Sequence, residues 1–233
     1  MHTHQIDRES VATSICGLWP SLTASQRSLL ADHLSVSRYK RGEMIYGEGD
    51  STERMYFLIS GKVKVIKAGV CGRGQIIRAV KPIEIFGYRA HFAHAMHRSR
   101  AIALESSTVA SVPMSTIERL MLENPPMALR IVHHLAVLLG QSDERTVNLT
   151  QKHIRGRLAE ALLFLRDNYG LEEDGSTLSI YLSREDLANL SNMTTSNAIR
   201  TLSSFANEQV ISIDGKKIKL VDIEELLRIS KMG

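Results

Sequence analysis

Short runs of alternating apolar and polar residues fill the chain between positions 36 and 112, and this alternation constrains the fold more than any other feature. Residues 55–67, MYFLISGKVKVIK, show it clearly. Side chains of a β-strand point alternately to its two faces, so each run predicts a strand with one buried face. Glycine ends many of the runs, and glycine adopts the positive φ of a tight turn at little cost. Many short strands joined by turns predict a small barrel or roll.

The pattern changes after Pro113, where apolar residues begin to recur every three or four positions. Residues 114–123 predict a short helix, and residues 127–150, which contain no proline and a single glycine, predict one long helix. This long helix has two apolar stripes, so one can cover its own domain while the other meets a second chain. A purely intramolecular role for both stripes is the alternative.

We assign the first stripe of the long helix to a homodimer interface, because its spacing alternates between three and four residues as in a coiled coil. It consists of Ala128, Ile131, Leu135, Leu138, Ser142, Arg145 and Leu149. We assign the parallel stripe to the surface that packs on the chain's own domain. It consists of Leu129, Val132, Ala136 and Leu139.

Two closely spaced helix starts follow a further amphipathic helix that begins at Ile154 and ends near 168–170. Ser183 precedes the first, with acidic residues in the first turn, and Thr194 precedes the second, which runs over 195–207. The small residue Ala188 and the turn residue Asn192 suit the junction between two crossed helices. The spacing therefore predicts a helix-turn-helix motif. The expected buried face of its second helix is Ala198, Ile199, Leu202 and Phe205.

The second helix of this motif presents polar side chains on its other face, and a hairpin follows it. Arg200 can bind a guanine edge through two hydrogen bonds, and the other polar side chains can contact bases or phosphates. Residues 210–213 and 216–220 alternate around the Asp214-Gly215 turn, which predicts a two-stranded wing with lysines at its tip for phosphate contacts. The candidate DNA-binding residues are Thr195, Ser196, Asn197, Arg200, Lys216 and Lys217.

Composition narrows the class of protein. With 43% hydrophobic and 23% charged residues the chain is typical of a folded globular protein, and its net charge of +4 is too small to locate a nucleic-acid site. The N-terminus lacks the apolar core of a secretory signal and no stretch suits a membrane span, so we expect a cytoplasmic protein without a membrane partner. Cys16 and Cys71 are too few for an iron–sulfur cluster and are expected to be free thiols; a redox role stays open.

The order of roll, long helix and winged helix-turn-helix resembles the Crp/Fnr superfamily of transcription regulators over nearly the whole chain. The resemblance rests on YKRGEMIYGEGD at 39–50, the strands at 55–65, GRLA at 156–159 and LSREDLA at 182–188. It implies an α+β fold in three parts. These are N-terminal helices with a cyclic-nucleotide-binding-like β-roll effector domain (1–113), a short helix and a long dimerisation helix (114–151), and a C-terminal winged helix-turn-helix that binds DNA (152–233).

The resemblance also implies how such a chain works. It implies a homodimer on a palindromic double-stranded DNA site, with RNA polymerase as a further partner and an effector in the roll. In this superfamily arginine and glutamate commonly occupy the places of Thr195 and Ser196, while Arg200 matches. We therefore expect a DNA site that shares only part of the usual palindrome.

The effector pocket that the resemblance implies departs from the nucleotide-binding pattern. Members that bind cyclic nucleotides hold the ribose with a glutamate, and Tyr88 stands in that place. Without that carboxylate we do not expect cyclic AMP as the effector, although an arginine and a serine can still bind another anion. The candidate pocket residues are Gly87, Tyr88, Arg89, Arg98, Ser99 and Ser142.

Haem or gas sensing is another hypothesis for this segment, and a histidine-rich surface is its alternative. The candidate haem ligands are His91, His94, Met96 and His97. For the whole chain, a small-molecule or redox-binding protein whose C-terminal domain contacts proteins is a rival, which would lack the steep salt dependence of DNA binding. We do not expect an enzyme, because the sequence shows no nucleophile–base pair, phosphate loop or metal-ligand cluster.

Overall fold

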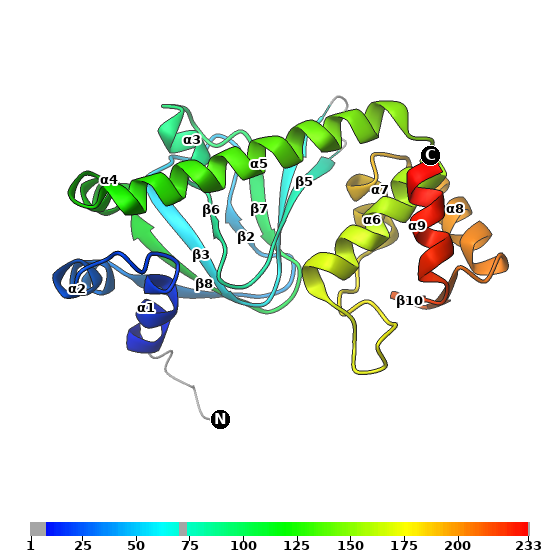
Figure 1. Cartoon of the computed structure of the whole chain (residues 1–233), viewed down its shortest axis with the longest axis horizontal. Helices are drawn as coiled ribbons and strands as arrows, with labels where there is room; N and C mark the ends of the chain where they lie inside the picture. The colour runs from blue at the N-terminus through cyan, green and yellow to red at the C-terminus, as the bar shows by residue number, and fades with distance from the viewer. Residues whose placement is uncertain (1–7, 70–73, 233) are drawn as a thin grey trace. The chain divides into compact units, whose positions relative to one another are not determined.

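The computed structural model describes residues 8–69 and 74–232 and divides the chain into two compact units (Figure 1). The first unit contains residues 1–67 and 77–138, and the second contains residues 68–76 and 139–233. Cys71 lies outside the described residues. Within the described ranges no helix combines the length and the apolar character needed to cross a membrane.

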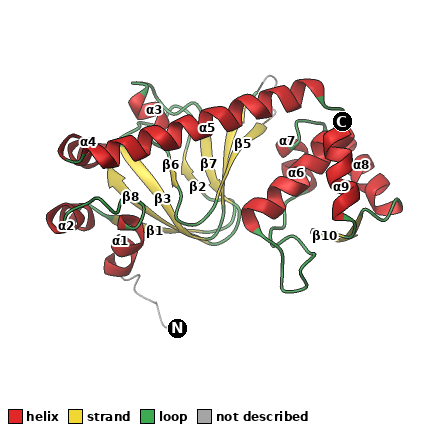
Figure 2. Cartoon of the chain, viewed as in Figure 1, coloured by secondary structure: helices red, strands yellow, loops and turns green. Residues whose placement is uncertain are grey.

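Helices flank a strand-rich middle and then dominate the C-terminal part of the chain (Figure 2). In chain order the described elements are α1 (Arg8–Cys16), α2 (Ala24–Asp32), β1 (Ser35–Tyr39), β2 (Met44–Tyr46), β3 (Arg54–Ser60), β4 (Val63–Ala68), β5 (Gly74–Val80), β6 (Ile85–Phe86), α3 (Arg89–Phe92), β7 (Arg100–Ala103), β8 (Ser107–Pro113), α4 (Met114–Glu123), α5 (Pro125–Gln151), α6 (Ile154–Tyr169), α7 (Arg184–Leu190), α8 (Thr195–Asn207), β9 (Ile211–Asp214), β10 (Lys217–Leu220) and α9 (Ile223–Met232).

The strands of the first unit form two four-stranded sheets, in the orders β1-β8-β3-β6 and β2-β7-β4-β5. β8 pairs antiparallel with both β1 and β3, and β7 pairs antiparallel with β2 and β4. Apolar side chains from both sheets meet in one core cluster that includes Tyr46, Leu58, Val65 and Phe86. The two sheets therefore enclose a common core, which confirms the β-roll predicted from the alternating pattern.

A second core, which we call the helix-side core, lies between the first sheet and the helices. Phe57 and Leu58 are neighbours on β3 and are both fully buried, because successive side chains of a strand point to opposite faces. Leu58 joins the core between the sheets, whereas Phe57 joins α1, α2, α4 and the first half of α5. The Trp19 and Phe57 rings pack nearly perpendicular to each other, with their centroids 5.7 Å apart. The first half of α5 thus covers the roll (Figure 1).

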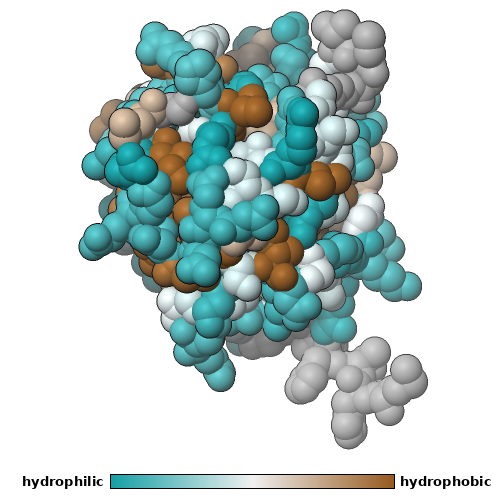
Figure 3. All heavy atoms as spheres, turned by 90° about the vertical axis from the view of Figure 1, so that its right-hand side faces the viewer, coloured by the Kyte–Doolittle hydropathy of each residue, from teal (hydrophilic) through white to brown (hydrophobic). Residues whose placement is uncertain are grey.

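The second unit is a bundle of helices with a two-stranded hairpin, β9 and β10. Its core is built from residues that the helical periodicity predicted, and Leu158, Leu187, Ala198 and Phe205 are fully buried or nearly so. The surface at the α8 and α9 end of this unit is largely hydrophilic, with apolar side chains scattered over it rather than gathered in one patch (Figure 3). The helices followed by the β9–β10 hairpin confirm the predicted winged helix-turn-helix and, with the roll, the predicted α+β fold.

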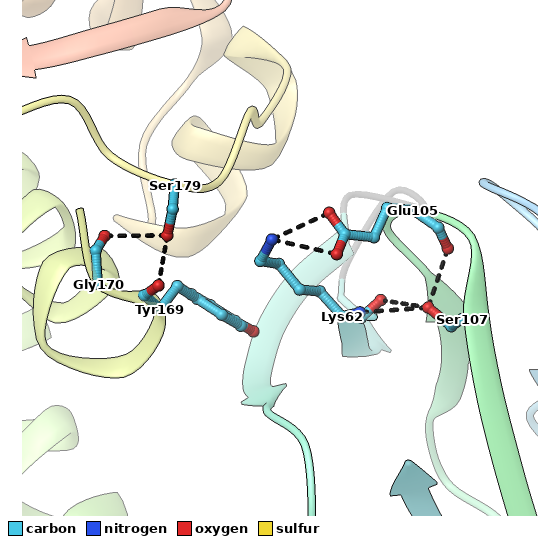
Figure 4. A network of polar contacts seen from close by, with 6 residues as sticks. All are labelled: Lys62, Glu105, Ser107, Tyr169, Gly170 and Ser179. Carbon is cyan, nitrogen blue, oxygen red and sulfur yellow. Dashed lines mark hydrogen bonds and ion pairs between the residues drawn. The ribbon is translucent and has the colours of Figure 1, made fainter. Parts of the chain in front are cut away.

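Serine hydroxyls close one turn in each unit (Figure 4). In the first unit Ser107 Oγ lies 2.9 Å from the Glu105 carbonyl oxygen, and the Lys62 amide donates to the same hydroxyl over 3.2 Å. A Cβ on Gly61, whose φ is 87°, would lie only 2.4 Å from that oxygen, so only glycine fits this turn. In the second unit Ser179 donates to the carbonyls of Tyr169 and Gly170 at the end of α6.

Ile83 adopts a φ of 64° in the turn between β5 and β6, a conformation that β-branched residues avoid. Its amide donates to the Leu58 carbonyl over 2.7 Å, so the turn holds this backbone in place. Both Ile83→Gly and Ile83→Ala remove the side-chain atoms beyond Cβ, but only glycine also removes Cβ and so relieves the strain. We expect the glycine variant to be more stable than the alanine variant by about 1 kcal/mol, the reverse of the usual order. Urea denaturation measures the difference, and an alanine variant of equal or greater stability would contradict this prediction.

Candidate DNA-binding surface and effector cavity

The starts of α7 and α8 are capped by the residues that the sequence indicated. Ser183 Oγ accepts a hydrogen bond from the Asp186 amide over 3.0 Å, and Thr194 Oγ1 accepts one from the Asn197 amide over 3.2 Å. Between the helices Asn192 has a φ of 50°, the left-handed conformation that asparagine tolerates. These caps use N–H groups that have no partner inside the helix, so they fix where α8 begins.

The buried face of α8 differs from the expectation at one residue. Ala198, Leu202 and Phe205 are buried as predicted, but Ile199 is 47% exposed and Thr201 is buried in its place. The expectation followed hydrophobicity, whereas a helix face follows steps of three and four residues, and 198, 201, 202 and 205 obey these steps. The prediction that Ile199 is buried is therefore wrong.

The polar side chains proposed to read DNA are accessible on α8. Thr195, Ser196 and Arg200 are exposed, and Asn197 is half-buried. The Arg200 guanidinium donates a hydrogen bond to Asn197 Oδ1. This contact orients the arginine and leaves its other donors for a further partner. Ser196 and Asn197 lie four and three residues before Arg200 and so share its face of α8, while Thr195 is the first residue of the helix beside them.

A residue that sequence reasoning missed, Arg155, holds α8 against α6. Arg155 donates to Ser204 Oγ over 2.7 Å and to the two carboxylate oxygens of Glu208 over 2.8 and 2.6 Å. Its guanidinium also lies 5.0 Å from the centre of the Phe205 ring. The Arg155 hydrogen bonds, followed by that of Ser204, lower the pKa of Glu208 to about 2. The partners are some fifty residues apart in sequence, so no local pattern could reveal this contact.

The wing carries its lysines as expected, but two of them already face carboxylates in the loop before α7. Lys217 Nζ lies 3.5 Å from Glu172 and Lys219 Nζ lies 3.7 Å from Asp174. Lys216 is exposed beside the turn glycine Gly215, whose carbonyl accepts a hydrogen bond from Arg184 over 2.8 Å. A phosphate contact by Lys217 would therefore have to compete with Glu172, whereas no carboxylate among the described residues forms an ion pair with Lys216.

The roll contains a cavity of about 370 Å³, within the size range of small-molecule sites. Its walls include four of the predicted pocket residues, Gly87, Arg89, Arg98 and Ser99. Lys67 and Arg78 add further positive charge, and none of the described lining residues is acidic. Arg78 is paired with Glu84 over 3.2 Å, which leaves Lys67, Arg89 and Arg98 as the cationic residues of the cavity for which no ion pair is described. Ser142, also predicted here, belongs to the second unit.

Tyr88 does not line this cavity. It is fully buried in the helix-side core, where its ring lies 6.1 Å from Phe92 and 6.2 Å from His134 on α5. Burial raises the pKa of its hydroxyl to about 12, so it stays neutral. The expectation that Tyr88 contacts an effector is corrected, because its neighbours Gly87 and Arg89 face the cavity while its own ring packs under α5.

The four candidate haem ligands do not converge on one point. Met96 and His97 line the cavity, whereas His91 and His94 do not. Both ring nitrogens of His91 lie 2.8 Å from acceptors, the Thr52 carbonyl and Glu118, so neither is left for iron. His97 is 4% exposed and stacks on Tyr46 at 3.9 Å, and its buried Nε2 has no hydrogen-bond partner in the described part of the chain. His97 is thus the histidine that a cavity ligand could engage.

Cys16 lies at the end of α1, where it is buried among apolar side chains. Burial raises the pKa of its thiol. Since the thiolate is the reactive form of cysteine, this environment makes Cys16 a slow nucleophile and a poor redox sensor.

The two stripes of α5 exchange the roles that we expected. In the stripe that we assigned to the dimer interface, Ile131 is buried in the helix-side core and Leu135 packs against that core. Met127, one turn before Ile131, is buried there too, so this stripe covers the roll. The prediction that Ile131 contacts a partner chain is therefore wrong, and Ala128, Leu135, Leu138 and Leu149 of the same stripe are half-buried while Ser142 is exposed. Arg145, at the same spacing, donates to the Leu190 carbonyl at the end of α7 over 2.9 Å.

The other stripe of α5, assigned to the chain's own domain, is the exposed one. Leu129, Val132 and Leu139 are 67%, 57% and 65% exposed, and Ala136 is exposed between them. Periodicity could not show which stripe is covered, because both have the spacing of a helix face. We call these four residues the exposed α5 stripe.

Comparison with known proteins agrees with both units. Residues 36–124 match the cyclic nucleotide-binding domain, and residues 156–229 match the Crp-like helix-turn-helix domain. A CRP-like cAMP-activated global transcriptional regulator from Mycobacterium tuberculosis is 25% identical over 213 residues, which cover 91% of this chain and 95% of that protein. The global nitrogen regulator of Nostoc sp. is 26% identical over 192 residues, covering 78% of this chain and 83% of that protein.

The fold comparison extends this likeness to solved structures. The structure of FixK2 from Bradyrhizobium japonicum superimposes with a TM-score of 0.76 at 23% identity, over 84% of this chain and 96% of that one. Both domain matches occur in the order that the roll and the helix-turn-helix have here. The chain therefore belongs to the Crp/Fnr superfamily of DNA-binding transcription regulators.

Proposed function

We propose that this regulator acts in the cytoplasm as a homodimer that reads a palindromic site through Thr195, Ser196, Asn197 and Arg200 of each α8. The outward face of α8, with its capped start and its single oriented arginine, is the observation that carries the proposal. Two such helices would enter successive major grooves, about 34 Å apart. RNA polymerase is the further partner expected of a transcription regulator.

The readout is tested by selecting DNA from a random library and measuring Arg200→Ala on the selected site. We expect the variant to lose about 1–3 kcal/mol for each base contact and to relax specificity at one position, because a guanidinium bound to a guanine is lost. Lys216→Ala is the matched comparison, since loss of a phosphate contact should weaken all sequences alike and lower the salt slope. Unchanged affinity of Arg200→Ala, or binding that salt does not weaken, would refute the readout.

We further propose that the effector is a small anion other than a cyclic nucleotide. Arg89, Arg98 and Ser99 supply donors around the cavity, and no acidic side chain among the described lining residues opposes a negative charge. His97 adds a buried ring nitrogen that has no hydrogen-bond partner among the residues that the structure describes. The carboxylate that would bind a ribose hydroxyl is missing, because Tyr88 stands in its place. The Tyr88 ring packs in the helix-side core.

The effector proposal predicts a thermal shift that depends on Arg98. Citrate and pyrophosphate serve as anionic probes, because a ligand that binds only the folded protein raises the melting temperature. We expect a smaller rise for Arg98→Ala than for the unchanged protein. Arg41→Ala is the control, because Arg41 is exposed and lies outside the cavity wall. A larger shift with cyclic AMP than with either probe, or equal shifts in both variants, would contradict the proposal.

A further inference from the structure

Ile199 is the exposed apolar side chain on an otherwise polar recognition surface. It is 47% exposed although it lies in the second turn of α8, between Ser196 and Ser203 on the outward face. Residues three and four positions apart are neighbours on a helix surface, so these two serines flank it. Their short side chains cannot cover it, and Ile199 therefore projects from the face that carries Arg200.

The local structure does not require isoleucine at this position. The side chains with which α8 packs into the core include Ala198, Leu202 and Phe205, which are at most 1% exposed. β-branched residues are poorer helix formers than alanine, so an exposed isoleucine gains nothing for α8 itself. Single exposed apolar residues are common on protein surfaces, but this one lies on the face that Arg200 shares.

The chemistry of the major groove offers one apolar group, the 5-methyl of thymine. A β-branched side chain in a helix is held near one rotamer, so Ile199 would lose little conformational freedom when it contacts a base. Its exposed methyl and methylene groups match a methyl group and offer nothing to a phosphate or a hydrogen-bonding base edge. We propose that Ile199 is a specificity-determining residue that contacts a thymine methyl in each half-site, an inference that rests on the proposed readout by α8.

The contact can be tested because deoxyuridine removes the methyl group alone and keeps the base pair. In the site selected by the full-length protein, each thymine is replaced in turn by deoxyuridine. We expect one position per half-site where the unchanged protein loses affinity about fourfold, the effect of removing one buried methyl-sized group from contact. Ile199→Ala should bind the thymine and deoxyuridine sites equally, and Ile199→Val should keep part of the difference.

Ser203→Ala is the matched control, because Ser203 is exposed on the same helix and should keep the full deoxyuridine effect. Far-UV circular dichroism verifies that each variant is folded. If Ile199→Ala retains the deoxyuridine effect, or no thymine position matters, the inference is overturned while specific binding by Arg200 still stands. If no DNA sequence is selected at all, the proposed readout fails and this contact fails with it.

Discussion

Replacing both Leu129 and Leu139 by glutamate is expected to leave the chain folded but monomeric, and to weaken binding to the proposed palindromic site by about 10²–10⁴-fold. Both leucines belong to the exposed α5 stripe, through which we propose that the two chains pair. They are 67% and 65% exposed, so the charges do not disturb the core of either unit. In a dimer the second recognition helix binds as an intramolecular event, and the loss of that effect sets the magnitude. Analytical ultracentrifugation and a DNA-binding assay measure the two consequences.

A variant of an exposed leucine on another helix tests whether the loss of the dimer is specific to the exposed α5 stripe. Leu122 on α4 is 85% exposed and lies outside this stripe. Leu122→Glu should therefore keep the dimer and its affinity for the palindrome. A double variant that still sediments as a dimer would show that the chains associate through another surface. A shift to monomers in Leu122→Glu would show that the interface extends to α4.

Truncating Phe205 to alanine is expected to destabilise the second unit by roughly 3–5 kcal/mol and to abolish most DNA binding at elevated temperature. Phe205 is fully buried on the inner face of α8, and the Arg155 guanidinium lies 5.0 Å from its ring centre. The variant loses apolar burial, leaves a cavity and removes the surface on which Arg155 rests. Guanidinium denaturation followed by far-UV circular dichroism reports the free energy of unfolding.

The size of this effect distinguishes packing from simple hydrophobicity at position 205. Phe205→Leu keeps a branched apolar side chain and leaves a smaller cavity, so it should cost less than Phe205→Ala. If Phe205→Ala costs no more than Phe205→Leu, the ring does not anchor α8 as described. A loss of DNA binding without a loss of stability would instead assign Phe205 a role in positioning Arg155.

Local signals predicted much of the second unit. Ser183 and Thr194 cap their helices through hydrogen bonds to amides three residues ahead, so the sequence around each cap is sufficient to locate the helix start. Asn192 marks the turn for the same reason, since its left-handed backbone depends on its own side chain. The roll followed from the period of its strands, because a period of two is set by the backbone alone.

Contacts distant in sequence decided what these signals left open. From the sequence alone it follows that α5 has two apolar stripes, that α8 is amphipathic and that glycine and arginine residues flank position 88. The folded chain shows in addition that Ile131 faces the roll and Leu129 does not, that Ile199 is exposed, and that Tyr88 lies in the core. Periodicity specifies which residues share a face, whereas the face that is covered depends on how its packing partners fit against it.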